Sequence, residues 1–207
     1  MEITFPYHVG HRVQSERKHR IIEEKVNRGA EFIMKPEQID PEEFVRWERI
    51  AGVIYDMTPS PSAEHQRVVT RLIRDISGYL KGRECESFVA PFDVYLDGEE
   101  AGDCVQPDIT IICDPNKIQR KGCVGAPDMV VEVLSPRTAK KDKTTKLMAY
   151  KRAGLRECWI VDPYNQTVEI YLFASVDHVF PTVYNRDDTV NVSTVAGLAI
   201  NLQDIFD

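Results

Sequence analysis

The most constraining feature of the sequence is an apolar run that a single carboxylate interrupts. Residues Met129–Leu134 are apolar except for Glu132, and a short run of this kind predicts a buried strand. Burying an unpaired carboxylate costs several kcal/mol, so Glu132 must bind a cation, accept hydrogen bonds or stay protonated. The fold has to supply one of these three solutions.

Two long segments are predicted to be helices. The first begins at Ser60-Pro61, where proline suits the first turn. Its apolar residues recur at spacings of three and four, typical of a helix with one buried face; they are Val68, Val69, Leu72, Ile73, Ile76 and Leu80. The second helix spans Thr138–Ala153 and ends at Gly154, a residue common just after a helix. A third start, at Asp40-Pro41, leads through Phe44 to Trp47.

The remaining apolar segments are short and lie between turn residues, which predicts strands. We expect strands at Ile50–Met57, Phe88–Leu96, Val105–Cys113, Met129–Leu134, Cys158–Val161 and Thr167–Phe173, shorter ones near Val183 and at Val190–Val192, and a terminal helix at Leu202–Phe206. The turn at Tyr164-Asn165 predicts a hairpin between two of these strands. Strands joined by hairpins and accompanied by helices predict one α/β domain with a mixed β-sheet flanked by α-helices.

Composition and charge limit the class of protein. The chain has 207 residues, of which 43% are apolar and 29% charged, the usage of a soluble globular domain. No span approaches the roughly 20 apolar residues needed to cross a bilayer. Residues 1–35 are predicted to be an N-terminal extension of unassigned role, and residues 36–207 the folded domain. The net charge of -7 argues against indiscriminate coating of nucleic acid but leaves room for a local basic groove.

The five cysteines are scattered, with no CxxC pair. A disulfide scaffold and a structural zinc site are therefore poorly supported. Cys113 lies in an apolar run and Cys158 beside Trp159, so both are interpreted as small core residues of a cytoplasmic protein.

A second carboxylate is expected to meet Glu132. Asp108 lies within the strand Val105–Cys113, on the face that it shares with Thr110. If this strand neighbours the one with Glu132, the two carboxylates converge, and at about 4 Å they repel by roughly 4 kcal/mol at an effective dielectric near 20. A divalent cation removes that repulsion, and hard oxygen ligands favour Mg²⁺ or Mn²⁺ over zinc.

The second predicted helix carries a polar stripe. Asp142, Lys146 and Tyr150 are each four residues apart and share one face. Two interpretations stay open: an ion pair beside a packed tyrosine, or Lys146 aimed at the strand with Glu132, where an ammonium group would stabilise a phosphate and orient an attacking water. The same segment carries the concentrated positive charge of the chain, which suits either a solvated helix or a polyanionic backbone; these residues are Lys140, Lys141, Lys143, Lys151 and Arg152.

These residues form an ordered string that resembles a known family. The string is Pro107-Asp108, then Glu132-Val133-Leu134-Ser135-Pro136, then Asp142, Lys146 and Tyr150, then Gly154-Leu155 and Cys158–Pro163, with Glu48–Tyr55 and Pro59–Gln66 upstream. From about Glu42 to Tyr171 the chain resembles the Uma-type family of restriction endonucleases. That family is a branch of the PD-(D/E)XK nuclease superfamily, so the resemblance implies a restriction endonuclease-like core.

The resemblance implies an endonuclease that hydrolyses DNA phosphodiester bonds with Mg²⁺ or Mn²⁺. Asp108 and Glu132 would be the metal ligands, with the backbone carbonyl of Val133 a third. The superfamily's usual lysine, two residues after the glutamate, is replaced by Leu134. Lys146 on the following helix would be its counterpart, positioning or helping to deprotonate the water. Superfamily nucleases pair two sites to cut both strands, which allows a homodimer.

Glu64, on the first predicted helix, would be an accessory acidic residue of the catalytic set. A carboxylate there is equally favoured by the helix dipole, and the roles of the adjacent His65 and of Tyr150 stay open. Asp128 is interpreted as structural. The leading alternative to an enzyme is a degenerate nuclease fold that binds nucleic acid or a protein, favoured by the missing lysine and the acidic charge. A third interpretation is a stable scaffold whose polar stripe is an ion-pair network.

Overall fold

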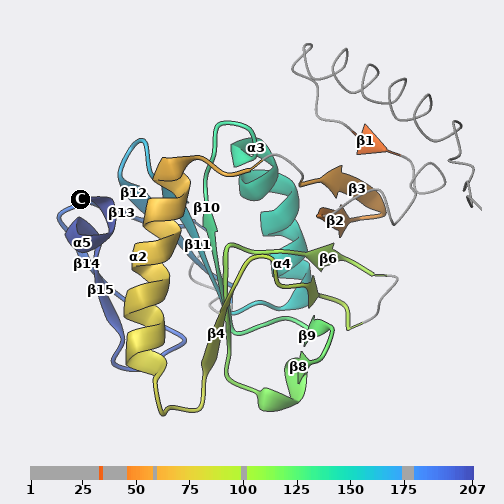
Figure 1. Cartoon of the computed structure of the whole chain (residues 1–207), viewed down its shortest axis with the longest axis horizontal. Coiled ribbons are helices and arrows are strands. Elements are labelled where there is room, and N and C mark those ends of the chain that lie inside the picture. The colour runs from red at the N-terminus through yellow and green to blue at the C-terminus, as the bar shows by residue number, and fades with distance from the viewer. Residues whose placement is uncertain (1–32, 35–45, 58–59, 99–101, 174–179) are drawn as a thin grey trace, which may run out of the picture.

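The centre of the fold is a six-stranded mixed β-sheet (Figure 1). The computed structural model describes residues 33–34, 46–57, 60–98, 102–173 and 180–207. The strands in sheet order are β13 (Thr182–Asn185), β12 (Thr167–Leu172), β11 (Glu157–Asp162), β10 (Met129–Val133), β7 (Ile109–Ile112) and β4 (Glu86–Val89). β10 and β11 run parallel, and the other neighbours are antiparallel. The predicted hairpin of β11 and β12 is confirmed.

The pairing of β7 with β10 sets up the site. Val131 lies opposite Ile109 in this antiparallel pair. One step further along the same register, Glu132 comes opposite Asp108, which lies just before β7 begins. The two strands predicted to be neighbours are therefore neighbours, and they bring both carboxylates to one end of the sheet.

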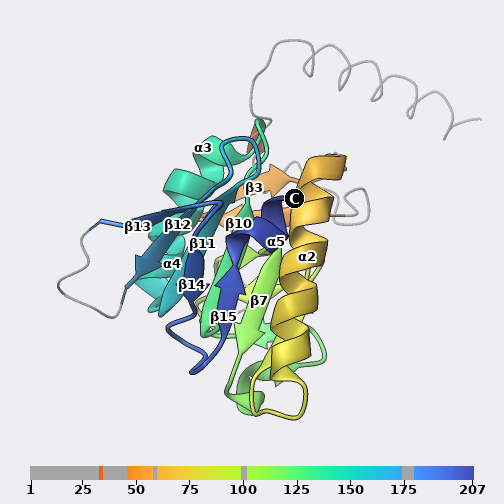
Figure 2. The ribbon, with the colours of Figure 1, turned by 90° about the vertical axis from the view of Figure 1, so that its left-hand side faces the viewer.

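Helices cover both faces of the central sheet, as predicted (Figure 2). On one face lies α2 (Ala63–Leu80), whose Val68, Leu72 and Ile76 are buried in a cluster with Ile109 and Val131. On the other face lies a continuous helical segment: α3 (Ala139–Lys141), the π-helical turn η3 (Asp142–Lys146) and α4 (Leu147–Ala153). The first helix starts slightly later than predicted, with Ser62 rather than Ser60 as its cap.

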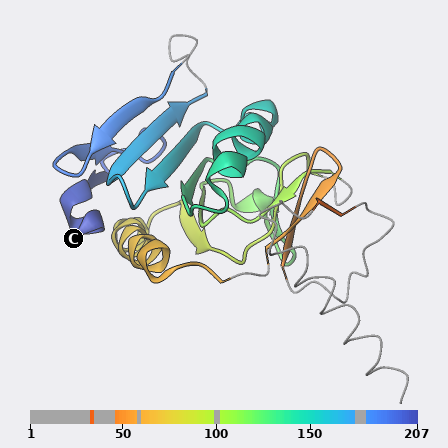
Figure 3. The same ribbon diagram turned by 90° about the horizontal axis from the view of Figure 1, so that it is seen from above.

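The C-terminal part of the chain packs on the α2 side. It consists of β14 (Thr189–Asn191), β15 (Ala199–Asn201) and α5 (Leu202–Phe206), the terminal helix that the sequence predicted. Val190, Ile200 and Ile205 join the same buried cluster as α2. Figure 3 shows α5 beside α2, where the Arg71 side chain donates to the backbone carbonyl of Ile205 at 3.0 Å. Among the described residues no helix combines the length and the apolar character of a membrane span.

A second sheet of seven short strands lies beside the first. Three segments that the sequence predicted to be continuous strands are divided, and parts of them belong to this second sheet. Its strands in order are β1 (Ile33–Met34), β3 (Val53–Asp56), β2 (Trp47–Ile50), β6 (Cys104–Val105), β5 (Val94–Tyr95), β9 (Gly122–Val124) and β8 (Ile118–Gln119), the last preceded by a 3-10 turn, η2 (Pro115–Lys117). Ile33 and Met34, placed in the extension by the sequence, thus pair with β3.

Each long strand predicted from the sequence is broken at a specific point. The predicted strand Ile50–Met57 contains the turn between β2 and β3. Ala51 and Gly52 take positive φ angles of 50° and 75° there and reverse the chain. Phe88–Leu96 splits into β4 and β5 around Pro91, which has no N–H to donate to a ladder. Val105–Cys113 splits into β6 and β7 at Asp108. Trp47 lies in β2 and not at a helix end; the helix start at Asp40-Pro41 is outside the described residues.

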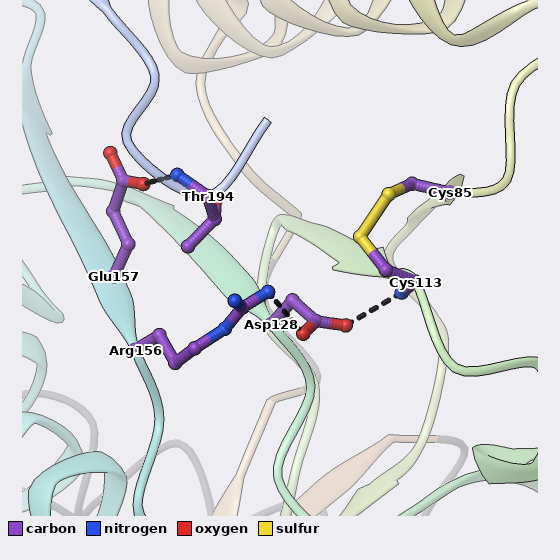
Figure 4. Close-up of a disulfide and its surroundings, with 6 residues drawn as sticks. All are labelled: Cys85, Cys113, Asp128, Arg156, Glu157 and Thr194. Atoms are coloured by element: carbon purple, nitrogen blue, oxygen red, sulfur yellow. Dashed lines mark hydrogen bonds and ion pairs between the residues drawn. A yellow bond between two sulfur atoms is a disulfide. The ribbon is translucent and has the colours of Figure 1, made fainter. Parts of the chain in front are cut away.

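The cysteines differ in part from the prediction. Cys85 and Cys113 form a disulfide (Figure 4), so the interpretation of Cys113 as a free core thiol is wrong. The two residues lie opposite each other where β4 and β7 pair, one step beyond Glu86 and Ile112, a proximity that scattered positions in the sequence do not reveal. Cys158 is a buried free thiol, as predicted. Disulfides are rare in the reducing cytoplasm, so this pair does not fit the predicted compartment, which stays a prediction.

Asp128 has structural contacts of the kind expected for it. Its carboxylate accepts the backbone N–H of Cys113 at 2.6 Å and pairs with Arg156 (Figure 4). These bonds tie the start of β10 to the end of β7 and to the start of β11.

The contact between the β8–β9 turn and residue Asp93 predicts a strict need for glycine at position 122. A Cβ on Gly122 would lie 2.1 Å from the backbone oxygen of Asp93, at a φ of +133°. We expect Gly122→Ala to destabilise the protein by more than about 2 kcal/mol, measured by urea unfolding. The matched control is Gly78→Ala in α2, where a Cβ meets nothing within 4 Å; that change should stabilise by about 0.5–1 kcal/mol. Equal effects of the two changes would contradict this description of the turn.

Candidate active site

A buried cluster of charged side chains lies between β2, β10 and the helical segment. Its members are each at most 5% exposed: Glu48 from β2, Glu132 from β10, Lys141 from α3, and Asp142 and Lys146 from η3. Three layers of the fold therefore contribute charges to one place. Charged residues are seldom buried unless they are paired, so the contacts within the cluster account for its existence.

Lys146 is the centre of this cluster. Its Nζ lies 2.6 Å from Glu132 Oε1, 2.9 Å from Glu48 Oε1 and 3.9 Å from Asp142 Oδ1. The Tyr150 hydroxyl, one turn further along the helix, also donates to Glu132 Oε1. The predicted stripe of Asp142, Lys146 and Tyr150 thus does face Glu132. The π-helical turn that carries the first two is a feature found disproportionately at functional sites.

Glu48 is a member of the cluster that the sequence did not single out. It accepts hydrogen bonds from Lys141 Nζ at 2.7 Å and from the backbone N–H of Gln106 at 2.9 Å, in addition to its contact with Lys146. Burial alone would raise the pKa of Glu48, but the ammonium groups of Lys146 and Lys141 outweigh it and lower that pKa to about 2. The available signal was that Glu48 shares a strand face with the buried Ile50.

Asp108 is more exposed than the cluster and is held by two donors. Its Oδ2 accepts the backbone N–H of Val133 at 2.8 Å and contacts His65 Nε2 at 3.1 Å. The side chain is 19% exposed, and its Oδ1 accepts no hydrogen bond from the described residues. Val133 thus reaches Asp108 through its N–H; a metal-binding role for its carbonyl stays a prediction.

The start of α2 presents His65, and not Glu64, to this site. His65 is 6% exposed and contacts Asp108, and its Nδ1 has no hydrogen-bond partner among the described residues. The Glu64 side chain is 55% exposed and pairs with Arg67 at 3.5 Å. The structure therefore does not bring Glu64 into contact with the other predicted residues. A single position along the helix separates the buried face from the exposed one.

The site carries more negative than positive charge. Glu48, Asp108, Glu132 and Asp142 are four carboxylates, against the two ammonium groups of Lys141 and Lys146, so full ionisation leaves two negative charges unbalanced. Burial, and then the charges of Asp142, Asp108 and Glu48, raise the pKa of Glu132 to about 8 against the opposing pull of Lys146. Burial likewise raises the pKa of Asp142 to about 6. A proton or a cation is needed here near neutral pH.

The oxygen donors suit a hard divalent cation. Glu132 Oε1 is taken by Lys146 and Tyr150, whereas Oε2 accepts no hydrogen bond from the described residues. Together with Asp108 Oδ1 this leaves two carboxylate oxygens with open lone pairs. Within the described ranges no three His, Cys, Asp or Glu side chains are grouped to hold a metal. The predicted set has only two carboxylates and a backbone carbonyl, and its donor chemistry and excess negative charge fit Mg²⁺ or Mn²⁺.

The basic residues of the helical segment are largely engaged. Lys141 is buried in the cluster with Lys146, so the structure corrects the interpretation of Lys141 as part of the exposed positive charge of this segment. Lys143 pairs with Glu169 at 2.6 Å and Arg152 with Asp103 at 3.0 Å. Lys140 and Lys151 are left as the exposed members without a partner among the described residues.

The raised pKa of Glu132 predicts a particular dependence of stability on pH. Because the folded state holds this proton up to about pH 8 and the unfolded state releases it near the ordinary glutamate pKa of 4.5, stability is lost as the pH rises through this window. Between pH 6 and pH 8, above the raised pKa of Asp142, wild type should lose on the order of 1 kcal/mol per pH unit.

The isosteric change Glu132→Gln removes the titrating group and should flatten that slope. Urea unfolding with EDTA at the two pH values measures it, and Glu64→Gln, on the exposed side of α2, is the matched control. A slope in Glu132→Gln equal to that of wild type would show that another group titrates.

Comparison with known proteins supports the fold. A crystal structure of a protein from Anabaena variabilis, described as a putative nuclease belonging to DUF820, superposes with a TM-score of 0.65 at 23% sequence identity and covers 82% of this chain and 94% of its own. That likeness confirms the predicted fold class. An uncharacterized protein of Synechocystis sp., slr1290, is 26% identical over 159 residues, which are 73% of this chain and 76% of that protein.

The family model gives the assignment. The Uma2 model, described as "Putative restriction endonuclease", matches residues 35–203, which include the whole charged cluster, Asp108 and His65. The ordered motif string seen in the sequence lies inside that match. The chain belongs to the Uma2 family.

Proposed function

We propose that the protein is a metal-dependent endonuclease that hydrolyses phosphodiester bonds of DNA. The observation that supports this most is the register of β7 and β10, which puts Asp108 opposite Glu132 at one end of the central sheet, each with one carboxylate oxygen engaged and the other without a hydrogen bond from the described residues. Family membership supports nuclease chemistry in general. The choice of DNA, the metal and the catalytic activity are our proposal, as are the homodimer and the domain boundary at residue 36.

The proposed metal ligands are Asp108, Glu132 and the backbone carbonyl of Val133, and the proposed ion is Mg²⁺ or Mn²⁺. When bound, such an ion lowers the pKa of a coordinated water and polarises a phosphate oxygen. The excess negative charge of the site and its hard oxygen donors support this choice.

The residues of the chain itself orient the two carboxylates. Val133 N–H and His65 hold Asp108 by Oδ2, which turns Oδ1 outward. Lys146 and Tyr150 hold Glu132 by Oε1, which leaves Oε2 for a ligand. Each carboxylate therefore needs no rearrangement to accept a cation, and such preorganisation is where much catalytic power resides.

The role that we propose for Lys146 differs from the role that the sequence predicted. The sequence predicted that its ammonium group would contact the phosphate and the attacking water. At 1% exposure, between Glu48 and Glu132, it has no access to a substrate. We therefore propose that Lys146 is a positioning residue, which fixes the Glu132 side chain and favours its ionised form.

The rival function is a nuclease fold that binds nucleic acid without cutting it. Two observations favour it: both lysines of the cluster are buried, and Leu134 occupies the usual lysine position. The two functions differ in turnover and not in binding, so one assay separates them.

The test is nicking of supercoiled plasmid DNA in Mg²⁺ or Mn²⁺. Wild type should nick it only with metal, and Asp108→Asn should lose at least about 100-fold in rate, more than the 10–100-fold typical of groups that merely orient a ligand. Glu64→Gln, the exposed neighbour of His65, should stay within about threefold of wild type, because it is outside the site. A loss in Glu64→Gln as large as in Asp108→Asn would restore the accessory role that the sequence assigned to it.

Calorimetric titration with Mn²⁺ gives a readout independent of turnover. Heat of binding in wild type that disappears in Asp108→Asn supports the proposed ligands. DNA binding by wild type without metal-dependent nicking would support the binding module instead. Nicking that persists in Asp108→Asn would contradict the proposed site.

A further inference from the structure

The site needs an accessible cation that its own lysines do not provide. Lys141 and Lys146 are 5% and 1% exposed and are bound by carboxylates. Asp108, the more exposed carboxylate, carries the same sign of charge as a phosphodiester backbone. A polyanion that approaches Asp108 therefore requires positive side chains on the nearby surface.

A polar cavity of about 250 Å³, whose lining includes Gln106 two residues before Asp108, has such side chains. It is lined by residues 91–93, by Gln106 and by the turn Arg120–Gly122 between β8 and β9 (Figure 1). Arg120 and Lys121 are both exposed. The Arg120 side chain makes no hydrogen bond or ion pair with the described residues, and Lys121 Nζ lies 5.0 Å from the centre of the Tyr95 ring.

The cavity wall is continuous with the site. Gln106 is two residues before Asp108, and its backbone N–H donates to Glu48 in the buried cluster at 2.9 Å. The N–H of Ala90, the residue before the lining residue Pro91, donates to the backbone carbonyl of Asp108 at 3.2 Å. The same backbone segments thus position Asp108 and shape the cavity.

The two cations are carried on a firmly placed turn. The N–H of Cys123 donates to the backbone carbonyl of Asp93 at 2.8 Å, and the absence of a side chain on Gly122 permits that approach. The Asp93 carboxylate also lines the cavity, but its Oδ1 accepts from the Gln106 amide at 2.8 Å and belongs to the wall. Arg46 adds a third positive charge beside it, donating to the Gln106 side-chain oxygen at 3.4 Å.

We infer that this cavity and its rim bind backbone phosphates of the DNA, one through Arg120 and one through Lys121, beside the phosphodiester at Asp108. This inference rests on the proposed function and names the surface that holds its substrate. The polynucleotide then enters over the β8–β9 turn, and not along the basic helical segment that the sequence suggested. Arginine suits this task because its planar group donates in pairs to phosphate oxygens.

The test is equilibrium binding of a fluorescein-labelled DNA duplex of mixed sequence, in EDTA so that nothing is cut, over a range of salt. The double variant Arg120→Ala/Lys121→Ala should bind more weakly at low salt. Its plot of log affinity against log salt should be shallower by about two, since each phosphate contact contributes about 0.9 to the slope. The ratio of wild-type affinity to variant affinity should therefore fall roughly tenfold between about 50 and 200 mM salt.

The matched control removes two exposed positive charges elsewhere. Lys140→Ala/Lys151→Ala, on the helical segment, should keep the wild-type slope within about one, and Arg120→Lys should keep most of the affinity. Urea unfolding equal to wild type shows that each variant is folded. Equal weakening in both double variants, or none in Arg120→Ala/Lys121→Ala, overturns the inference.

The outcome for wild type separates this inference from the proposed function. If wild type nicks plasmid DNA and Arg120→Ala/Lys121→Ala binds DNA as tightly as wild type, only the phosphate-binding role of the cavity is disproved. Wild type that neither binds nor nicks DNA disproves the proposed function and the cavity with it.

Discussion

The contact of one ammonium group with two carboxylates joins the three layers of this fold. Lys146 from the helical segment binds Glu132 of the central sheet and Glu48 of the second sheet. Buried ion pairs seldom add net stability, because desolvation offsets their attraction, yet removing one partner typically costs about 3–5 kcal/mol. The cluster therefore does more to fix relative positions than to hold the protein folded. It makes one arrangement of the layers much better than its near alternatives.

Asp108 is positioned by a different device. Its backbone is placed by the pairing of β7 with β10, and its side chain replaces a ladder partner by accepting the N–H of Val133. This bond explains why the strand is interrupted at Asp108, and it fixes the direction of a side chain that is not deeply buried. The site thus combines a buried half, held by ion pairs, with a more accessible half, held by backbone and His65.

The features that could be predicted from sequence were those with a local signal. An apolar run located β10 and its anomalous Glu132, helical periodicity located α2, and spacing by four located the stripe of Asp142, Lys146 and Tyr150. The contact between Glu48 and Lys141 had no local signal, because the two residues are 93 residues apart; for Glu48 alone the signal was only the strand face that it shares with Ile50. The disulfide between Cys85 and Cys113 also had no local signal, because the pairing of β4 with β7 brings the two residues together. Glu64 and His65 show the limit of periodicity: adjacent residues were separable only by seeing which one faces the sheet.

The placement of Lys146 on a helix makes its contact with Glu132 depend on the packing of one layer on another. A lysine two residues after the glutamate would share its strand, and its distance from the proposed metal ligands would be set by the backbone alone. Here that distance depends on how the segment from α3 to α4 rests on the sheet. A small sliding of that segment would weaken the contact of Lys146 with Glu132 while leaving every strand pair intact, so the geometry around Glu132 depends on how well the helical segment packs on the sheet.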